Sequence, residues 1–111
     1  LKPIKQGVAL FYLKHTSAAI AIQERDKTQT CQNDMKKFLD DLAPDSEMFA
    51  HKFDGSDDMS AHIKSTIVGT NHSIPIQNGK LMLGQYQGIW LLEFWRPEVE
   101  RKMVVTLFGE E

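Results

Sequence analysis

The sequence lacks the features that identify secreted and membrane proteins. Its 111 residues include a single cysteine, Cys31, so no disulfide can form within the chain. No apolar run approaches the ~18 residues of a membrane-spanning helix, and no signal peptide is visible. We therefore expect a cytoplasmic protein with no membrane partner.

The charged residues show no excess of one sign. Thirteen Lys and Arg residues face fifteen Asp and Glu residues, which gives a formal net charge of −2. There is no basic stripe with interleaved aromatic residues, so we do not expect a nucleic-acid partner. Neither a P-loop nor a GxGxxG motif occurs, which excludes nucleotide binding through those phosphate loops.

The composition fits one globular domain that spans residues 1–111, with 41% apolar and 25% charged residues. Apolar and β-branched residues predict strands near 7–15 and 18–24. Apolar side chains spaced at i, i+3, i+4 and i+7 then predict a helix within 28–44 that ends at Pro44.

The second half of the chain predicts a helix, a hairpin and two strands, at residues 57–69, 73–83, 86–95 and 101–110. Asp57 or Asp58 would cap the helix, and Asn78–Gly79 would form the hairpin turn. This order predicts an α+β fold, with an antiparallel or mixed β-sheet and two helices packed on one face.

Residues 51–65, HKFDGSDDMSAHIKS, are the densest group of side chains that bind metals or move protons. A helix over DMSAH would place Asp58 and His62 on one face, and His51 would reach them from the preceding loop. Two imidazoles with one or two carboxylates suit Zn²⁺. If carboxylates dominate, the set suits Mg²⁺ and a diphosphate substrate instead.

A structural alternative explains the same residues. Asp57 and Asp58 at a helix start are ordinary capping residues, and Asp54–Gly55 is an ordinary turn. The spacing also matches no rigid metal motif such as HExxH. From spacing alone, both interpretations stay open.

The tripeptide HTS at residues 15–17 separates the first two predicted strands. His15 and Ser17 would lie on the same side of an extended chain, where they would make a base and a nucleophile. The alternative is a turn whose hydroxyl groups bond the backbone.

Glu93 lies inside the apolar run GIWLLEFW. It either points to solvent or supplies a site or interface, with Arg101 as a partner on the neighbouring strand. His72, in GTNHS, is predicted to be an exposed turn residue. Cys31 has no basic neighbour and is predicted to be a structural thiol.

Taken in order, four segments resemble the YjbQ-like family, also called secondary thiamine-phosphate synthase enzymes. They read HTSAAIAI, FAHKFDGSDDMSAHIKSTIVG, SIPIQNGKLMLGQYQGIWLLEF and a final FGE. The resemblance runs from about Gly7 to Glu110, and the family's N-terminal strand is mostly absent before Gly7. Gln85–Tyr86 replaces the usual Thr–Trp pair, a departure that concerns substrate contacts rather than the fold.

The resemblance implies an α+β domain that forms a homotrimer, with a polar site near the subunit contacts and a small-molecule phosphate substrate. It also implies weak thiamine-phosphate synthase activity in some members and leaves the main physiological role open. The residues that it places in the site are His15, Thr16, Ser17, His51, Asp57, Asp58, His62, Lys64, Gln87 and Glu93. Of these we expect His15, Ser17, Lys64 and Glu93 to be catalytic, and His51, Asp57, Asp58 and His62 to be metal ligands.

Three hypotheses for the function follow. The first is a synthase that joins a pyrimidine diphosphate to a thiazole phosphate, in which Asp57 and Asp58 hold a divalent ion and Lys64 faces phosphate. The second is a metal-dependent hydrolase with His51 and His62 as ligands. The third is a non-catalytic trimeric ligand-binding protein that buries an apolar strand face between subunits.

Overall fold

The computed structural model describes residues 3–46, 48–52, 55, 57–96 and 99–111. Its elements are β1 Gln6–Lys14, β2 Ala18–Glu24, α1 Thr30–Leu42, α2 Asp58–Val68, β3 Asn71–Gln77, β4 Lys80–Leu81, β5 Gln87–Glu93 and β6 Lys102–Glu110. The α+β class predicted from the sequence is confirmed. No helix in these ranges is long and apolar enough to cross a membrane.

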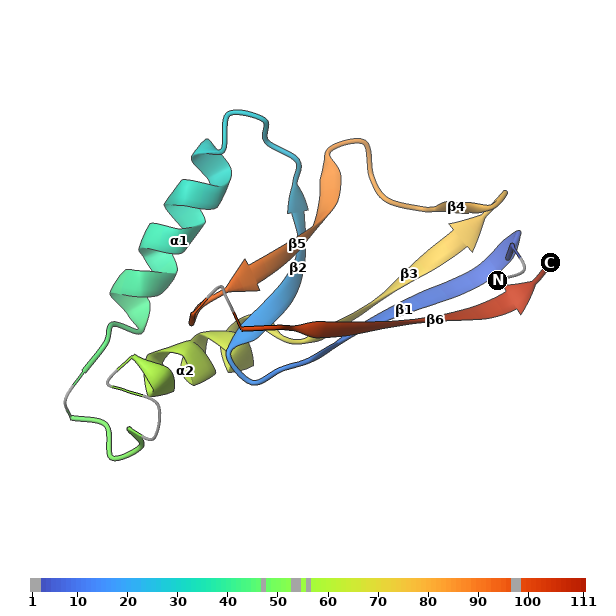
Figure 1. Cartoon of the computed structure of the whole chain (residues 1–111). Coiled ribbons are helices and arrows are strands. Elements are labelled where there is room, and N and C mark those ends of the chain that lie inside the picture. Colours follow the sequence, from blue (N-terminus) through green and yellow to red (C-terminus); the bar gives the residue numbers. More distant parts are fainter. Residues whose placement is uncertain (1–2, 47, 53–54, 56, 97–98) are drawn as a thin grey trace.

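The strands form two antiparallel sheets rather than one. The larger sheet has the order β4-β3-β1-β6, and the smaller one pairs β2 with β5. Figure 1 shows the larger sheet extending away from both helices, which lie at the end of the molecule formed by β2 and β5. The chain passes from the first sheet to the second at residues 15–17, between β1 and β2.

The core cluster lies where β1 leads into β2, beside β5. Leu13, Ala18 and Ile20 form a buried cluster with Phe11 and Ile89 against it. Full burial of a side chain such as Leu or Ile stabilises a fold by about 1.5–3 kcal/mol. This cluster therefore fixes the junction between the two sheets, beside which the candidate site is built.

Local turn chemistry explains the β3–β4 hairpin. Asn78 has φ 53° and Gly79 has φ 73°, so both turn residues adopt the left-handed conformation. Asn-Gly is the pair that tolerates this conformation best in a two-residue hairpin turn. The predicted hairpin is confirmed.

The predicted helix cap is wrong. Asp57 is the residue before α2, but no side chain there bonds the helix backbone. The start of α1 is instead held by Asp26, which accepts the backbone N–H of Cys31 at 3.0 Å. Hydrogen bonds from the Thr28 and Thr30 side chains and from backbone N–H groups hold the pKa of Asp26 well below its ordinary value.

Three further predictions have different outcomes. His72 is not an exposed turn residue: it lies in β3, half-buried, and its Nε2 is 2.8 Å from the carbonyl oxygen of Ile20. This contact ties the two sheets together. Asp54, from the turn predicted at Asp54–Gly55, lies outside the described residues. The half-buried Cys31 thiol has its pKa raised by burial and by nearby acids, as a structural thiol should.

Candidate metal centre

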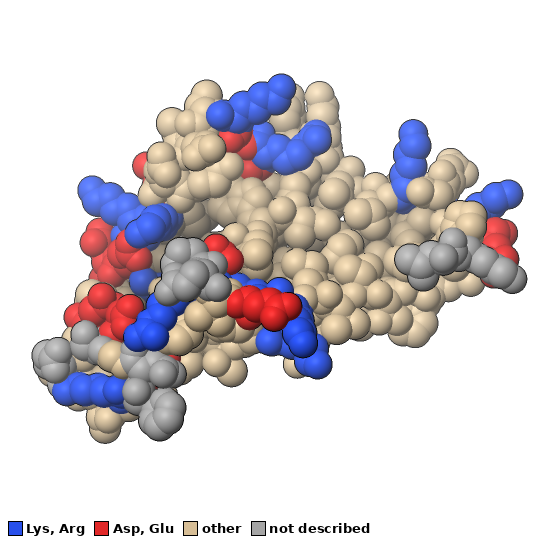
Figure 2. Space-filling model, in the orientation of Figure 1, with Lys and Arg blue, Asp and Glu red and all other residues tan. Residues whose placement is uncertain are grey.

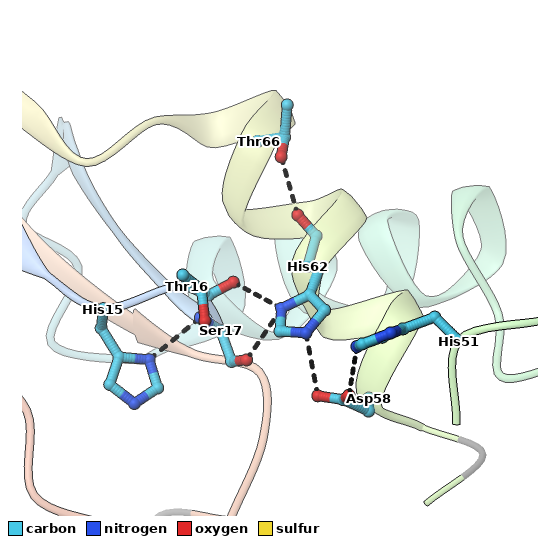
Figure 3. A network of polar contacts seen from close by, with 7 residues as sticks. All are labelled: His15, Thr16, Ser17, His51, Asp58, His62 and Thr66. Atoms are coloured by element: carbon cyan, nitrogen blue, oxygen red, sulfur yellow. Dashed lines mark hydrogen bonds and ion pairs between the residues drawn. The ribbon is translucent and has the colours of Figure 1, made fainter. Parts of the chain in front are cut away.

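Three side chains converge at the start of α2. Asp58 and His62 lie one turn apart on the helix, and His51 reaches them from the preceding loop (Figure 3). One ligand atom from each of these residues lies within 4.8 Å of the others. The rings of His51 and His62 have centroids 5.3 Å apart. Helical periodicity thus brings two of the ligands together, and the loop adds the third.

Asp58 is the buried centre of the cluster. Its side chain is 3% exposed, with Oδ1 3.0 Å from His62 Nε2 and Oδ2 2.9 Å from His51 Nε2. His51 does not meet Oδ2 with the geometry of a hydrogen bond, so within the described part of the chain this buried oxygen has no hydrogen-bond partner. A buried carboxylate is costly unless it is paired or coordinates a cation.

The second ring nitrogen of His62, Nδ1, decides the tautomer of the ring. Nδ1 lies 2.8 Å from the carbonyl oxygen of Thr16, which can only accept a hydrogen bond. Nδ1 therefore carries the proton, and in the neutral ring Nε2 presents a lone pair toward Asp58. Two acceptors 3.0 Å apart need a proton or a metal ion between them. A backbone carbonyl behind the ring is the usual support of a metal-ligating histidine.

The hydroxyl of Ser17 does not form a nucleophile–base pair in this structure. Ser17 Oγ lies 3.1 Å from His62 Nδ1, but that nitrogen carries the proton shared with Thr16. His15 Nδ1 accepts the backbone N–H of Ser17 at 2.9 Å rather than its hydroxyl proton. Ser17 is also 2% exposed, out of reach of a substrate. The Ser17 hydroxyl also does not bond the backbone as the turn alternative expects, because its partner is the His62 ring.

His15 borders the metal ligands without joining them. Burial lowers the pKa of His15 below its ordinary value, and the nearby Arg101 and His62 lower it further. The ring is therefore neutral near pH 7, with Nδ1 accepting and Nε2 carrying the proton. An open depression of about 800 Å³ lies beside the ligands, lined by His15, Thr16, His51, Met59, His62, Ser65, Thr66, Gly69 and Thr70.

Lys64 and Asp57 are not part of the cluster. The Lys64 side chain is 8% exposed, and its Nζ lies 2.7 Å from Asp40 Oδ1 on α1. Lys64 lines a separate cavity between α1 and β5. Asp57 precedes α2 and is not one of the three clustered side chains.

Glu93 also lies at that second cavity. Its Oε1 is 3.2 Å from Arg101 Nη1, so the predicted pairing is found, although Arg101 precedes β6 and the strand beside β5 is β2. Gln87, at the other end of β5, accepts the backbone N–H of Gly84 at 2.7 Å. The structure therefore gathers the histidines and Asp58 and leaves Glu93 and Gln87 elsewhere.

Two contacts that shape the site were not predicted from the sequence. The carbonyl of Thr16 orients His62 across 46 positions of sequence, and no side-chain pattern signals a backbone acceptor. Arg101, with a side chain 2% exposed, influences His15 from the far end of the chain. A buried arginine beside a histidine is visible only after folding.

Comparison with known proteins identifies relatives over nearly the whole chain. Residues 1–110 match the family described as UPF0047 protein YjbQ-like. The UPF0047 protein YjbQ of Salmonella typhimurium is 37% identical over 99% of this chain and 79% of its own length. The UPF0047 protein YugU of Bacillus subtilis is 35% identical over 96% of this chain and 77% of its own.

Solved structures agree with this relationship. A YbjQ-like protein of unknown function from Sulfolobus solfataricus superposes with a TM-score of 0.86 at 29% identity, covering 96% of this chain and 75% of that one. An uncharacterised YjbQ/UPF0047 family protein from Clostridium acetobutylicum gives 0.83 at 33% identity, covering 95% and 78%.

Proposed function

The chain belongs to the UPF0047 family of YjbQ-like proteins, and from the site that it carries we propose that it is a metal-dependent hydrolase. His51, Asp58 and His62 would hold one divalent ion. The observation that carries the proposal is the convergence of the three side chains, whose ligand atoms lie within 4.8 Å of one another around a buried Asp58 oxygen that has no hydrogen-bond partner among the described residues.

The donor set fits zinc better than magnesium. Two imidazole nitrogens and one carboxylate oxygen resemble the three protein ligands of catalytic zinc sites, which keep a fourth position open. Magnesium prefers oxygen ligands, and of the two carboxylates suggested by the sequence only Asp58 is in the cluster. Bound there, a divalent ion would supply a Lewis acid and lower the pKa of water.

The chain's own residues would complete the site. The Thr16 carbonyl holds the ring of His62 in one tautomer, and the burial of Asp58 strengthens its attraction for a cation. The neutral His15 ring has its Nε2–H left to donate to an oxygen of a substrate in the adjoining depression. The open side of the cluster gives that substrate access.

The synthase reaction implied by the family resemblance is a weaker fit to this geometry. It needs a cation beside the substrate phosphates. Lys64, the lysine expected there, lines the other cavity, where its Nζ lies 2.7 Å from Asp40 Oδ1. Hydrolysis of a carboxylic ester needs no cation besides the metal ion, so the cluster alone would be enough for it, whereas coupling of a pyrimidine diphosphate to a thiazole phosphate would need a further cation.

An assay with model substrates separates the two reactions. Protein purified without chelator, then given Zn²⁺ or Mn²⁺, should hydrolyse p-nitrophenyl esters or phosphates, and His62→Ala should lose the metal-stimulated rate. Asp41→Asn, an exposed acid on α1, is the matched control and should keep it. Synthase turnover that survives in His62→Ala, with no hydrolysis in the wild type, would contradict the proposal.

We also propose that the protein assembles with copies of itself, as a homotrimer in line with the family resemblance. Large apolar side chains are exposed along β1 and β6, and β6 pairs with a single neighbour, β1. Such edges and patches are usually covered by a partner. Light scattering after gel filtration should give three times the chain mass of 12.7 kDa, whereas a stable monomer would contradict the proposal.

A further inference from the structure

The open depression beside the candidate metal centre continues into a second one at the end of β1. The second depression has a volume of about 440 Å³. The two share three residues, His15, Thr16 and Thr70, and the second adds Tyr12, Leu13 and Lys14. Figure 3 shows His15 and His51 on opposite sides of His62. A molecule bound at the metal ligands can therefore extend past His15 to Lys14.

Two lysines face each other at the far end of this path. Lys14 is the last residue of β1, and Lys102 of β6 lies directly opposite it in the antiparallel pair. Side chains in this position share one face of the sheet, and like charges there destabilise it. Both lysines are exposed, and within the described residues neither forms an ion pair with an acid. An anionic group between the two ammoniums would remove their repulsion.

A third cation adds to the positive potential at this end. Arg101 precedes Lys102, and its side chain is buried. Burial and then the charge of Arg101 lower the pKa of His15, so the field of the guanidinium reaches the residue that both depressions share. Glu93 Oε1, 3.2 Å from Arg101 Nη1, offsets part of that charge. The two lysines have no such counter-charge, and the potential beside His15 favours an anion.

The path between the metal ligands and Lys14 is otherwise uncharged. Among the described residues that line either depression, Lys14 is the only lysine, arginine, aspartate or glutamate. The backbone N–H of Leu13 donates to the carbonyl of Thr70 at 2.8 Å, which holds the two sides of the second depression together. The middle of a bound molecule therefore needs no charge of its own, and a short neutral chain fits between the two ends.

The surroundings of Lys14 suit a carboxylate better than a phosphate. Phosphate sites commonly use a helix N-terminus, a run of backbone N–H groups or the fork of an arginine. The second depression lies at the end of a strand, and no arginine is among its described lining residues. Two ammonium point charges on flexible stems need no fixed fork geometry, so they can neutralise a carboxylate at the end of a chain.

We propose that the substrate of this site is an ester that keeps a free carboxylate, such as the monoester of a short dicarboxylic acid. The scissile carbonyl lies at the metal ligands, the chain passes His15, and the carboxylate lies beside Lys14 and Lys102. The oxygen of a water molecule bonds to the carbonyl carbon, the bond to the leaving alcohol breaks, and a proton passes from the water to that alcohol. The ester assignment rests on the proposed hydrolase, whereas the carboxylate subsite does not.

Binding without turnover tests the carboxylate subsite by itself. The probes are the monoanilide of adipic acid and the same compound with its carboxylate methylated, titrated by calorimetry into chelator-treated protein. At low ionic strength the anion should bind about fivefold or more tightly than the methyl ester, since two exposed ion pairs act together. Salt at about 1 M should remove most of this preference, because the screening length falls to about 3 Å.

Variants at exposed positions test the two lysines with little risk to the fold. Lys14→Met keeps the aliphatic stem and should reduce the preference for the anion to less than about twofold, and Lys102→Met should reduce it by a smaller factor. Lys14→Glu should reverse it, so that the methyl ester binds more tightly. Lys80→Met is the matched control and should keep the wild-type preference, because this exposed lysine lies on β4 and lines neither depression.

Turnover then links the subsite to the proposed hydrolase. In zinc-loaded protein, kcat/KM for p-nitrophenyl hydrogen adipate should exceed that for its methyl ester about fivefold or more, and Lys14→Met should lose this ratio. Carboxylate preference in binding without hydrolysis of either ester would support the subsite and overturn the ester assignment.

Three results would overturn the subsite. The first is equal affinity of the wild type for the two anilides, above all if Lys14→Met also changes the mass found by light scattering, since the lysines would then pair with acids of a second copy. The second is a preference that survives in Lys14→Glu. The third is a phosphonate in place of the carboxylate that binds more tightly than the carboxylate itself.

Discussion

The two ends of the molecule depart in opposite ways from the usual pattern of buried apolar and exposed polar groups. At the helical end, α2 and the turn before β2 supply the buried polar residues Ser17, Asp58, Ser60, Lys64 and Ser65, and the buried side chain of Arg101 lies before β6. At the other end, the four-stranded sheet exposes large apolar side chains along β1 and β6. Figure 2 shows most charged side chains on this face gathered near the helical end, with a largely uncharged surface over the sheet.

This difference indicates that the two ends have different roles, one as a site and the other as an interface. Burying polar groups costs free energy unless each finds a partner, so a cluster of them is maintained where chemistry requires it. Exposing apolar side chains costs free energy too, and the cost disappears when a second surface covers them. The helical end has the character of a site, and the sheet has the character of an interface.

The largest expected effect is a loss of zinc affinity at the helical end. Asp58→Asn keeps the shape of the side chain but removes its charge and one ligand oxygen. Zinc affinity, measured by calorimetry on chelator-treated protein, should fall at least a hundredfold, since loss of a supporting group alone costs about 10–100-fold. Asp41→Asn should bind zinc as the wild type does. Equal zinc affinity in the two variants would remove Asp58 from the centre.

The next largest effect is a loss of assembly at the sheet end. Val105 is 50% exposed in the middle of β6, where it pairs with Phe11 of β1. Val105→Asp should convert the assembly to monomers by light scattering, because a charge would be buried at the interface. Zinc affinity should change less than twofold. If the assembly survives with wild-type mass, β6 is not its interface.

A smaller effect is expected on the free energy of unfolding, where two neighbouring hydroxyls of α2 can be compared. Ser65 Oγ is buried and donates to the carbonyl of Ala18 at 2.7 Å, whereas Thr66 Oγ1 donates to the carbonyl of His62 on the exposed side. Ser65→Ala should lower the free energy of unfolding by about 1–2 kcal/mol, and Thr66→Ala should change it by less than about 0.5 kcal/mol. Urea denaturation measures both. Equal losses would mean that burial does not set the cost.

The smallest effect is a pH dependence at the boundary between the two ends. The folded-state pKa of His15 is lowered, so the unfolded chain binds more protons than the folded one once the pH drops below about 6.5. Stability should therefore fall as the pH drops from 7.5 to 5. In His15→Gln this fall should be smaller, as followed by urea denaturation at both pH values. An identical fall in the variant would show that His15 contributes nothing to it.

Local patterns were enough to predict most of the fold. The hairpin follows from the backbone tolerance of Asn78–Gly79, and the approach of Asp58 to His62 follows from the spacing of one helical turn. His72 was misjudged because GTNHS has the composition of a turn. Pairing with β1, in which Asn71 opposes Tyr12, holds it in a strand instead.

The remainder of the site depends on contacts between distant segments. The family resemblance placed Lys64 in the site, and we expected it to face phosphate, but the folded chain brings it to Asp40 of α1 instead. The support of His62 by the Thr16 carbonyl requires the β1–β2 turn to meet α2. No periodicity within a single segment carries such information.

Anomalous diffraction from crystals grown with zinc tests the central claim most directly. We expect one peak about 2.0–2.2 Å from His51 Nε2, His62 Nε2 and an oxygen of Asp58, with His62 Nδ1 still bonded to the Thr16 carbonyl. A map with no peak there, in which the His51 and His62 rings stay about 3 Å from the Asp58 oxygens with no ion between them, would contradict the account.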